Sequence, residues 1–204
     1  MKKILQPFVL VLVLAGLASG LGCLGGSRAM QVVYAINPAI GLKPYTVFLV
    51  VNDRRSLQDL LGPAARDQGL FTELRNDRFD LKVKLPDGSE VTMTNLTTSA
   101  AVREAVSRRL SSRQVVVTAQ RSAAQLTVEV DIRNLNINVV DSDLVATADL
   151  AAKVYRDPGS FVSSETAVTA KRLKLIGGLG GDRVLSEALT QAVNDLDFSA
   201  INNY

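Results

Sequence analysis

The sequence predicts an α+β domain with a mainly antiparallel sheet and two helices packed on one face of it. Three observations predict this class. Apolar and polar residues alternate in several segments, as in strands with one buried face. Two other segments have apolar residues at helical spacing. Three long alternating segments follow one another with short turns between them, which is typical of an antiparallel meander.

The first half of the chain is predicted to contain several short strands. Residues 31–36 fit a short strand, and residues 45–52 fit a strand buried on both faces because its centre is wholly apolar. Alternation over residues 79–85, a turn at Pro86-Asp87-Gly88 and a returning strand at residues 90–94 predict a β-hairpin.

A helix and a strand are expected next. Thr97, Thr98 or Ser99 supplies the side-chain oxygen that an N-cap needs, and the apolar spacing continues to about Ser111. Residues 114–118 are apolar enough for the following strand. The strand–helix–strand part therefore precedes the long meander.

The segment 126–140 is expected to be one long strand with a bend. Its apolar residues change from even to odd positions between Ile132 and Leu135, so a regular strand would expose half of them. A β-bulge between these two residues resolves the conflict. Strands over residues 144–156 and 163–176 complete the meander.

The last predicted element is an amphipathic helix capped by Asp182. Its apolar stripe consists of Val184, Leu185, Ala188, Leu189, Ala192, Val193 and Leu196. The glycine-rich residues 177–181 are interpreted as a joint, not as a phosphate-binding loop, because Gly181 is followed by an acid and not by Lys. A stripe of this length requires a sheet to pack against.

The N-terminus has the pattern of a bacterial export signal. Lys2 and Lys3 precede an apolar stretch over residues 8–22 that is shorter than the ~20 residues of a membrane span. We therefore expect a signal peptide at residues 1–22, which is removed in the mature protein.

Cys23, the only cysteine, follows this stretch, and the residues before it resemble the lipobox of bacterial lipoproteins. The match is offset because Gly20 stands where Leu is usual, so ordinary cleavage with an unmodified Cys23 is the alternative. We expect acyl chains on Cys23, a lipid-anchored flexible tether over residues 23–44 and a single periplasmic domain over residues 45–204. By resemblance to enterobacterial lipoprotein sorting, Leu24 after the cysteine favours the outer membrane over the inner one.

The composition excludes most catalytic chemistry. The 204 residues include no His and one Cys, so His-based acid–base pairs, Ser–His and Cys–His triads and His-containing zinc sites are absent. We expect no enzyme activity, no cofactor and no metal ion, since Asp141, Asp143 and Asp149 lack an EF-hand pattern. Removing residues 1–22 leaves 21 basic against 20 acidic residues, which argues against a nucleic-acid partner.

Two groups of charged residues are candidate contact sites. The first lies at the end of a predicted strand, where the residues either hold a ligand or pair with one another, and comprises Asp53, Arg54 and Arg55. The second lies in the predicted central helix, where the residues either meet an anionic partner or form a solvated face, and comprises Arg103, Arg108 and Arg109.

The order of motifs over residues 45–198 resembles the YajG-like lipoproteins of Gram-negative bacteria. The residues that carry the resemblance are Val50-Val51-Asn52-Asp53-Arg54-Arg55, Leu61-Gly62, the helix Val102–Leu110, the strand Gln114–Thr118, the alternating block Leu126–Leu135, Leu185–Leu189 and Ala192-Val193. The chain departs from the family in its offset lipobox and in an insertion-like segment, Pro63–Leu96. The resemblance implies a lipid-anchored envelope domain without a defined reaction.

These observations favour a non-enzymatic outer-membrane lipoprotein whose periplasmic domain binds another envelope protein through its sheet edge or its Arg-rich helix. The alternative is a carrier or sensor of a hydrophobic ligand held between helices and sheet, where Ala146, Ala148 and Ala152 leave room. A hydrolase that uses carboxylates is a third hypothesis, although no paired-carboxylate pattern is present.

Overall fold

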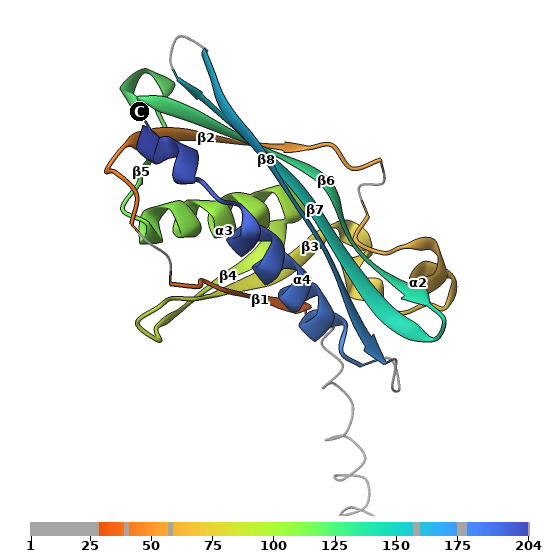
Figure 1. Cartoon of the computed structure of the whole chain (residues 1–204). Coiled ribbons are helices and arrows are strands. Elements are labelled where there is room, and N and C mark those ends of the chain that lie inside the picture. Colours follow the sequence, from red (N-terminus) through yellow and green to blue (C-terminus); the bar gives the residue numbers. More distant parts are fainter. Residues whose placement is uncertain (1–28, 39–40, 57–58, 157–159, 175–178, 204) are drawn as a thin grey trace, which may run out of the picture.

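A computed structural model of the chain describes residues 29–38, 41–56, 59–156, 160–174 and 179–203. This part forms two β-sheets with helices packed against them, which confirms the α+β class (Figure 1). The predicted signal peptide and Cys23 lie outside the described residues.

The larger sheet has five strands in the order β5-β2-β6-β7-β8. These are β2 (Thr46–Asp53), β5 (Val116–Thr118), β6 (Leu126–Val140), β7 (Asp143–Arg156) and β8 (Ser160–Lys174). Strand β2 runs parallel to both β5 and β6, whereas β6, β7 and β8 form the predicted antiparallel meander. The sheet is therefore mixed, with its long part antiparallel.

Strand β2 has one buried face. Val47 and Leu49 are fully buried, whereas Phe48 and Val50 are only half-buried. The prediction of two buried faces is therefore wrong, because an apolar run does not distinguish a central strand covered on both faces from one with an open outer face.

Strand β6 contains the predicted bulge. Ile132 lies opposite Leu150 and Asn134 lies opposite Asp149, so Arg133 is the extra residue. The bulge restores the apolar phase, because Ile132 and Leu135 are both fully buried on the same side of the sheet.

The smaller sheet was not predicted as a separate unit. It has the order β1-β3-β4, formed by β1 (Gln31–Ala35), β3 (Arg78–Lys84) and β4 (Glu90–Thr97). Strands β3 and β4 are the predicted hairpin, and β1 adds to β3 in parallel. Because β1 belongs to this sheet, the folded domain begins before residue 45, within the range predicted as tether.

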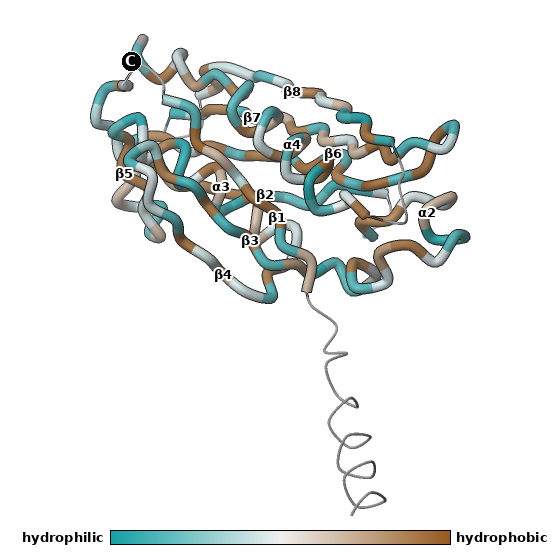
Figure 2. The backbone as a smooth tube through the Cα atoms, turned by 90° about the horizontal axis from the view of Figure 1, so that it is seen from below, coloured by the Kyte–Doolittle hydropathy of each residue, from teal (hydrophilic) through white to brown (hydrophobic). Residues whose placement is uncertain are grey.

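The two long helices of the described part lie between the sheets (Figures 1 and 2). Helix α3 (Thr98–Ser112) contacts β2 and β5 of the larger sheet and β3 and β4 of the smaller one. Helix α4 (Gly181–Asp195) contacts β6, β7, β8 and β1. Shorter helical turns are α2 (Pro63–Asp67), η1 (Thr72–Asn76), η2 (Arg121–Ala123) and η3 (Ser199–Asn203).

The two helices begin differently. Thr97, one of the three predicted caps, accepts the N–H of Ala100 at 3.3 Å and so caps α3. Asp182 does not cap α4, which is a correction: the cap position is Gly180, whose φ of +96° favours glycine, and Asp182 lies in the first turn. There its carboxylate still faces the positive end of the helix dipole.

The apolar stripe of α4 is buried as predicted. Every one of its seven apolar side chains is at most 1% exposed. The stripe packs on β7, where Ala146, Ala148 and Ala152 are equally buried. The small side chains therefore let the helix approach the sheet.

The opposite side of α4 closes the free edge of β1. Ser186 Oγ accepts the N–H of Val33 at 2.7 Å, and Thr190 Oγ1 accepts the N–H of Ala35 at 3.2 Å. One turn further on, Asn194 Nδ2 donates to the Ala35 carbonyl at 2.8 Å. The spacing fits because four helical residues rise about 6.0 Å and two strand residues about 6.7 Å. The edge backbone is thereby satisfied without a further strand.

We expect Thr190→Val to lower the free energy of unfolding by about 1–3 kcal/mol, because it leaves the part-buried N–H of Ala35 without an acceptor at nearly unchanged side-chain volume. Urea unfolding of the two proteins measures the difference. Gln191→Ala, at an exposed position of the same helix, is the control and should change stability by less than about 0.5 kcal/mol. Equal stability of Thr190→Val and the original protein would contradict the role of this helix in closing the edge.

Candidate functional site

Arg55 is the centre of an ion-pair network at the end of β2. Its Nε and Nη2 donate to the two carboxylate oxygens of Asp53 at 2.9 and 2.6 Å, and Nη2 also donates to Asp77 Oδ1 at 2.9 Å. The Arg55 side chain is only 2% exposed. Of the two functions considered for this segment, pairing between its own residues is therefore present in the structure.

Asp77 extends the network to the start of α3. Its Oδ1 accepts the hydroxyl of Thr98 at 2.6 Å, and its Oδ2 accepts the backbone N–H of the same residue at 3.4 Å. Asp77 has a positive φ of 53°, which turns the chain from η1 into β3. The network thus joins the end of one sheet's strand to the first turn of the helix between the sheets.

The charges of the network stabilise one another. The hydrogen bond from Arg55 holds the pKa of Asp53 below its ordinary value of 3.8. Burial alone would lower the pKa of Arg55, but the hydrogen bonds to the two aspartates outweigh it and raise that pKa. Arg54 is outside this buried network: its side chain is 66% exposed, and its Nε lies 3.5 Å from Asp131 Oδ1.

A cavity of about 360 Å³ lies beside the β6 bulge, and Arg55 lines it. The other polar side chains of its wall are Ser56, Asp59, Arg133, Asn134, Asn136 and Asp149. Two residues of the wall have a buried side-chain atom without a hydrogen-bond partner, Nη1 of Arg55 and Oδ1 of Asp149. We refer to this space as the bulge cavity.

The sequence indicated only part of the bulge cavity. Arg55 was a candidate residue, whereas Arg133 and Asp149 were not candidates for this site. The bulge itself was the signal that could have found them, because bulges occur often beside functional sites and this one places Arg133 and Asp149 near the end of β2.

The arginines of α3 do not form one basic patch. Arg103 Nη1 donates to the Leu49 carbonyl at 2.8 Å, and Arg108 pairs with Glu104 at 2.7 Å. Arg109 is buried, donates to the carbonyls of Asn37 and Asn194, and has its pKa lowered by burial. The solvated-face interpretation therefore fits Arg108, whereas Arg103 and Arg109 bind the backbone of neighbouring segments.

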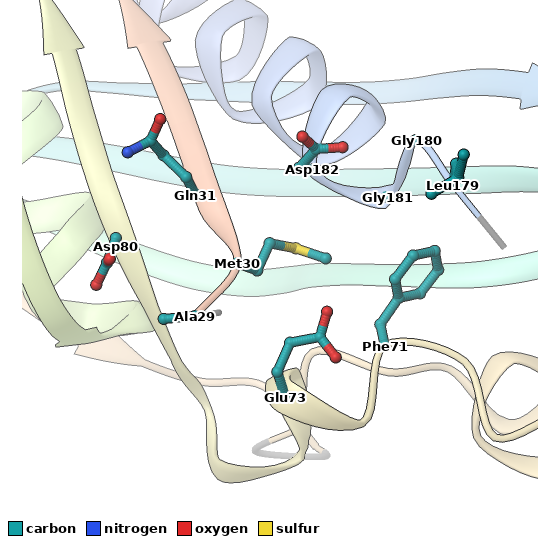
Figure 3. Close-up of a pocket in the computed structure, with 10 residues that line it drawn as sticks. All are labelled: Ala29, Met30, Gln31, Phe71, Glu73, Asp80, Leu179, Gly180, Gly181 and Asp182. Carbon is teal, nitrogen blue, oxygen red and sulfur yellow. The ribbon is translucent and has the colours of Figure 1, made fainter. Parts of the chain in front are cut away.

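A second cavity, of about 560 Å³, lies where β1 and α4 begin (Figure 3). Figure 3 shows Met30 and Phe71 between the carboxylates of Asp182 and Glu73. A Cβ at position 181 would lie 2.5 Å from the Phe71 ring, so a larger residue than Gly181 would displace this ring. The polar groups of this cavity are mostly acidic, and acids alone do not define a ligand.

Strand β8 forms a long open edge of the larger sheet. Phe161 and Val168 are 62% and 65% exposed in it, and Lys171 and Lys174 follow near its end. Arg172 pairs with Asp141 and Asp143 across the β6–β7 turn at 3.4 and 3.1 Å. The smaller sheet's β1 edge is covered by α4, so the two edges differ.

Metal binding and membrane spanning can be assessed for the described residues. They contain no group of three or more His, Cys, Asp or Glu side chains that could hold a metal ion. Among the helices of the same residues, none has both the length and the hydropathy to cross a membrane.

Comparison with known proteins shows a shared fold. No family model matches the chain, and no curated protein matches it. A protein of the family DUF330 from Xanthomonas campestris has 18% identity and a TM-score of 0.52 over 85% of this chain and 96% of its own. This likeness establishes the fold alone, and membership of the YajG-like family stays a prediction.

Two further solved structures are more distant. The PelC dodecamer from Paraburkholderia phytofirmans has 11% identity over 82% of this chain and 93% of its own, with a TM-score of 0.44. Lipoprotein GNA1162 from Neisseria meningitidis has 12% identity over 75% of this chain and 98% of its own, with a TM-score of 0.33.

We expect Arg55→Met to lower the free energy of unfolding by about 3 kcal/mol or more, because two carboxylates lose their shared partner. Arg54→Met is the matched control: it removes an exposed pair and should change stability by about 1 kcal/mol or less. Chemical unfolding measures both. Equal effects of the two substitutions would show that the network contributes nothing beyond a surface ion pair.

The network also predicts a pH dependence. Because the folded-state pKa of Asp53 lies below 3.8, its contribution to stability is fully present above about pH 5 and is lost as the pH falls through the folded-state value. The stability difference between the original protein and Asp53→Asn should therefore shrink between about pH 5 and about pH 2. Urea unfolding at several pH values measures it; a constant difference over this range would contradict the assignment.

Proposed function

We propose that the protein is a non-enzymatic binding component of the bacterial cell envelope. Lipid on Cys23 anchors it, and the folded domain lies on the periplasmic side of the outer membrane. The leader with its terminal cysteine supports the anchor, and the motif order that resembles YajG-like lipoproteins supports the compartment. The domain acts by holding another envelope protein, not by catalysing a reaction.

The observation that carries the binding function is the open edge of β8. This strand spans 15 residues, contains no proline and has two large apolar side chains exposed. Long edge strands are usually protected because their unpaired backbone groups accept a further strand. The same protein covers its β1 edge with three side chains of α4, so an open β8 edge is the surface suited to a partner.

The partner is an extended segment of another protein that adds to β8 as a strand. Backbone hydrogen bonds would supply affinity, as in other cases of strand addition. Apolar residues of the partner would cover Phe161 and Val168, and acidic residues would face Lys171 and Lys174. Glu165 is the single acid of β8, so charge complementarity favours an acidic segment.

We expect a photo-crosslinking residue in place of Val168 to crosslink the full-length protein to one partner in cells. Peptide mapping should place the crosslink in an acidic, extended segment of that partner. The same residue in place of Val116 is the control, since Val116 is 57% exposed on β5 at the opposite edge of the sheet. Val168→Lys should lower recovery of that partner at least about tenfold, which corresponds to about 1.4 kcal/mol.

Two outcomes would contradict binding at this edge. Equal crosslinking from positions 116 and 168 would show that contact is unspecific. A specific partner whose recovery is unchanged by Val168→Lys would show that the binding surface lies elsewhere on the domain.

The anchor has a separate test. The intact mass of the protein extracted from membranes should correspond to a polypeptide that starts at Cys23 and carries fatty acyl groups. Cys23→Ser should remove both the added mass and the retention in the membrane, because each buried methylene of an acyl group contributes about 0.8 kcal/mol to membrane binding. A mature chain without acyl mass would contradict lipid anchoring while leaving the β8 edge proposal open to its own experiment.

A further inference from the structure

We propose that the bulge cavity binds a small zwitterion of the amino-acid type. Its carboxylate would be held by Arg55 and Arg133, and its ammonium group by Asp149. This site is separate from the β8 edge and does not depend on the proposed function. Three features of the cavity carry the inference: an unused buried donor, an unused buried acceptor, and two residues of opposite charge that have no ion-pair partner.

The unused donor belongs to Arg55. Its Nε and Nη2 are occupied by Asp53 and Asp77, which fix the plane of the guanidinium, whereas Nη1 is buried without a partner. A buried N–H without an acceptor is unfavourable, and a carboxylate oxygen is the acceptor that pairs best with a guanidinium. The network therefore leaves one donor group of a rigidly held, cavity-lining cation without a partner.

The unused acceptor belongs to Asp149. Its Oδ1 is buried and lacks a hydrogen-bond partner, although the residue lies opposite Asn134 in the register of β6 and β7. Asn134 does not serve it: its Oδ1 accepts a hydrogen bond from Asn136 at 2.9 Å, and its Nδ2 donates none to Asp149 Oδ1. A positively charged donor such as an ammonium group would satisfy this carboxylate.

The charged residues of the cavity favour a ligand that carries one negative and one positive group. Asp59 is neutralised by Arg66 at 2.7 Å, and Arg55 by its two aspartates. Within the described residues, Arg133 and Asp149 have no ion-pair partner. A simple anion would leave Asp149 unsatisfied and a simple cation would leave Arg133 and Arg55 Nη1 unsatisfied, whereas a zwitterion serves all three.

Size and lining agree with this ligand. A volume of about 360 Å³ has room for an amino acid or a dipeptide, and Leu61 and Pro63 provide an apolar side for a small hydrocarbon group. The bulge also explains how the site arises, since Arg133 is the residue without an opposite neighbour on β7 and is available to the cavity.

The test is titration of the folded full-length protein by calorimetry with L-alanine, L-alanyl-L-alanine, acetate and methylammonium. We expect one of the two zwitterions to bind at a single site, at least about tenfold more tightly than acetate or methylammonium, because each single-charge probe lacks one charged hydrogen bond. Tighter binding of alanine would indicate adjacent charged groups, and tighter binding of the dipeptide would indicate separated ones.

Two variants test the residues without disturbing the Arg55 network. Asp149→Asn and Arg133→Gln should each raise the dissociation constant of the bound zwitterion about tenfold or more. Asp195→Asn and Arg121→Gln, which change the same charges at exposed positions far from the cavity, should leave it unchanged. Without ligand, Asp149→Asn should be at least as stable as the original protein, because it removes a charge that lacks a partner.

Three results would overturn the proposal. One is the absence of heat and of any thermal stabilisation with every probe, which would mean that the cavity holds water only. Another is binding of acetate or methylammonium as tight as that of the zwitterions. The third is zwitterion binding that Asp149→Asn and Arg133→Gln leave unchanged while both variants stay folded by circular dichroism.

Discussion

The fold depends on α4, which packs against the larger sheet and forms hydrogen bonds to the edge of the smaller one. Its apolar stripe is buried against β7 and β8, and its polar side donates to and accepts from the backbone of β1. A β-strand edge inside a protein must find hydrogen-bond partners. Here Ser186, Thr190 and Asn194 supply them, so the same helix that fills the core also ends the smaller sheet and holds it against the larger one.

Ion pairs and hydrogen bonds of charged residues join the ends of β2, β3 and α3. Asp53, Arg55, Asp77 and Thr98 connect the last residue of β2, the turn before β3 and the first turn of α3. Buried ion pairs of this kind contribute little net stability but are costly to break. Their consequence is geometric: the pairs fix Arg55 so firmly that its remaining nitrogen faces its surroundings in one orientation, which a freely rotating surface arginine would not have.

Much of the fold was predictable because it rests on local periodicity. The bulge in β6 and the buried stripe of α4 follow from the spacing of apolar residues, and the structure confirms both. The cap follows from the side-chain oxygens of Thr97, Thr98 and Ser99, of which the structure uses Thr97. The smaller sheet was not predictable in this way, because β1 pairs in parallel with a strand more than 40 residues later. The placement of Arg55 and Asp149 around one cavity similarly depends on the register of β2, β6 and β7, which no single segment encodes.

The two binding features proposed for this domain share one physical origin. Several described polar groups elsewhere are satisfied by helix side chains on a strand edge or by arginines on backbone carbonyls. Against that background, groups left unsatisfied are informative. Of the four buried side-chain atoms without partners in the described residues, two belong to residues that line the bulge cavity. The second feature is the backbone of β8, which lies at the edge of the larger sheet. In these two proposals the cavity would recognise charge and the edge would recognise an extended chain, so a protein and a small ligand would not compete.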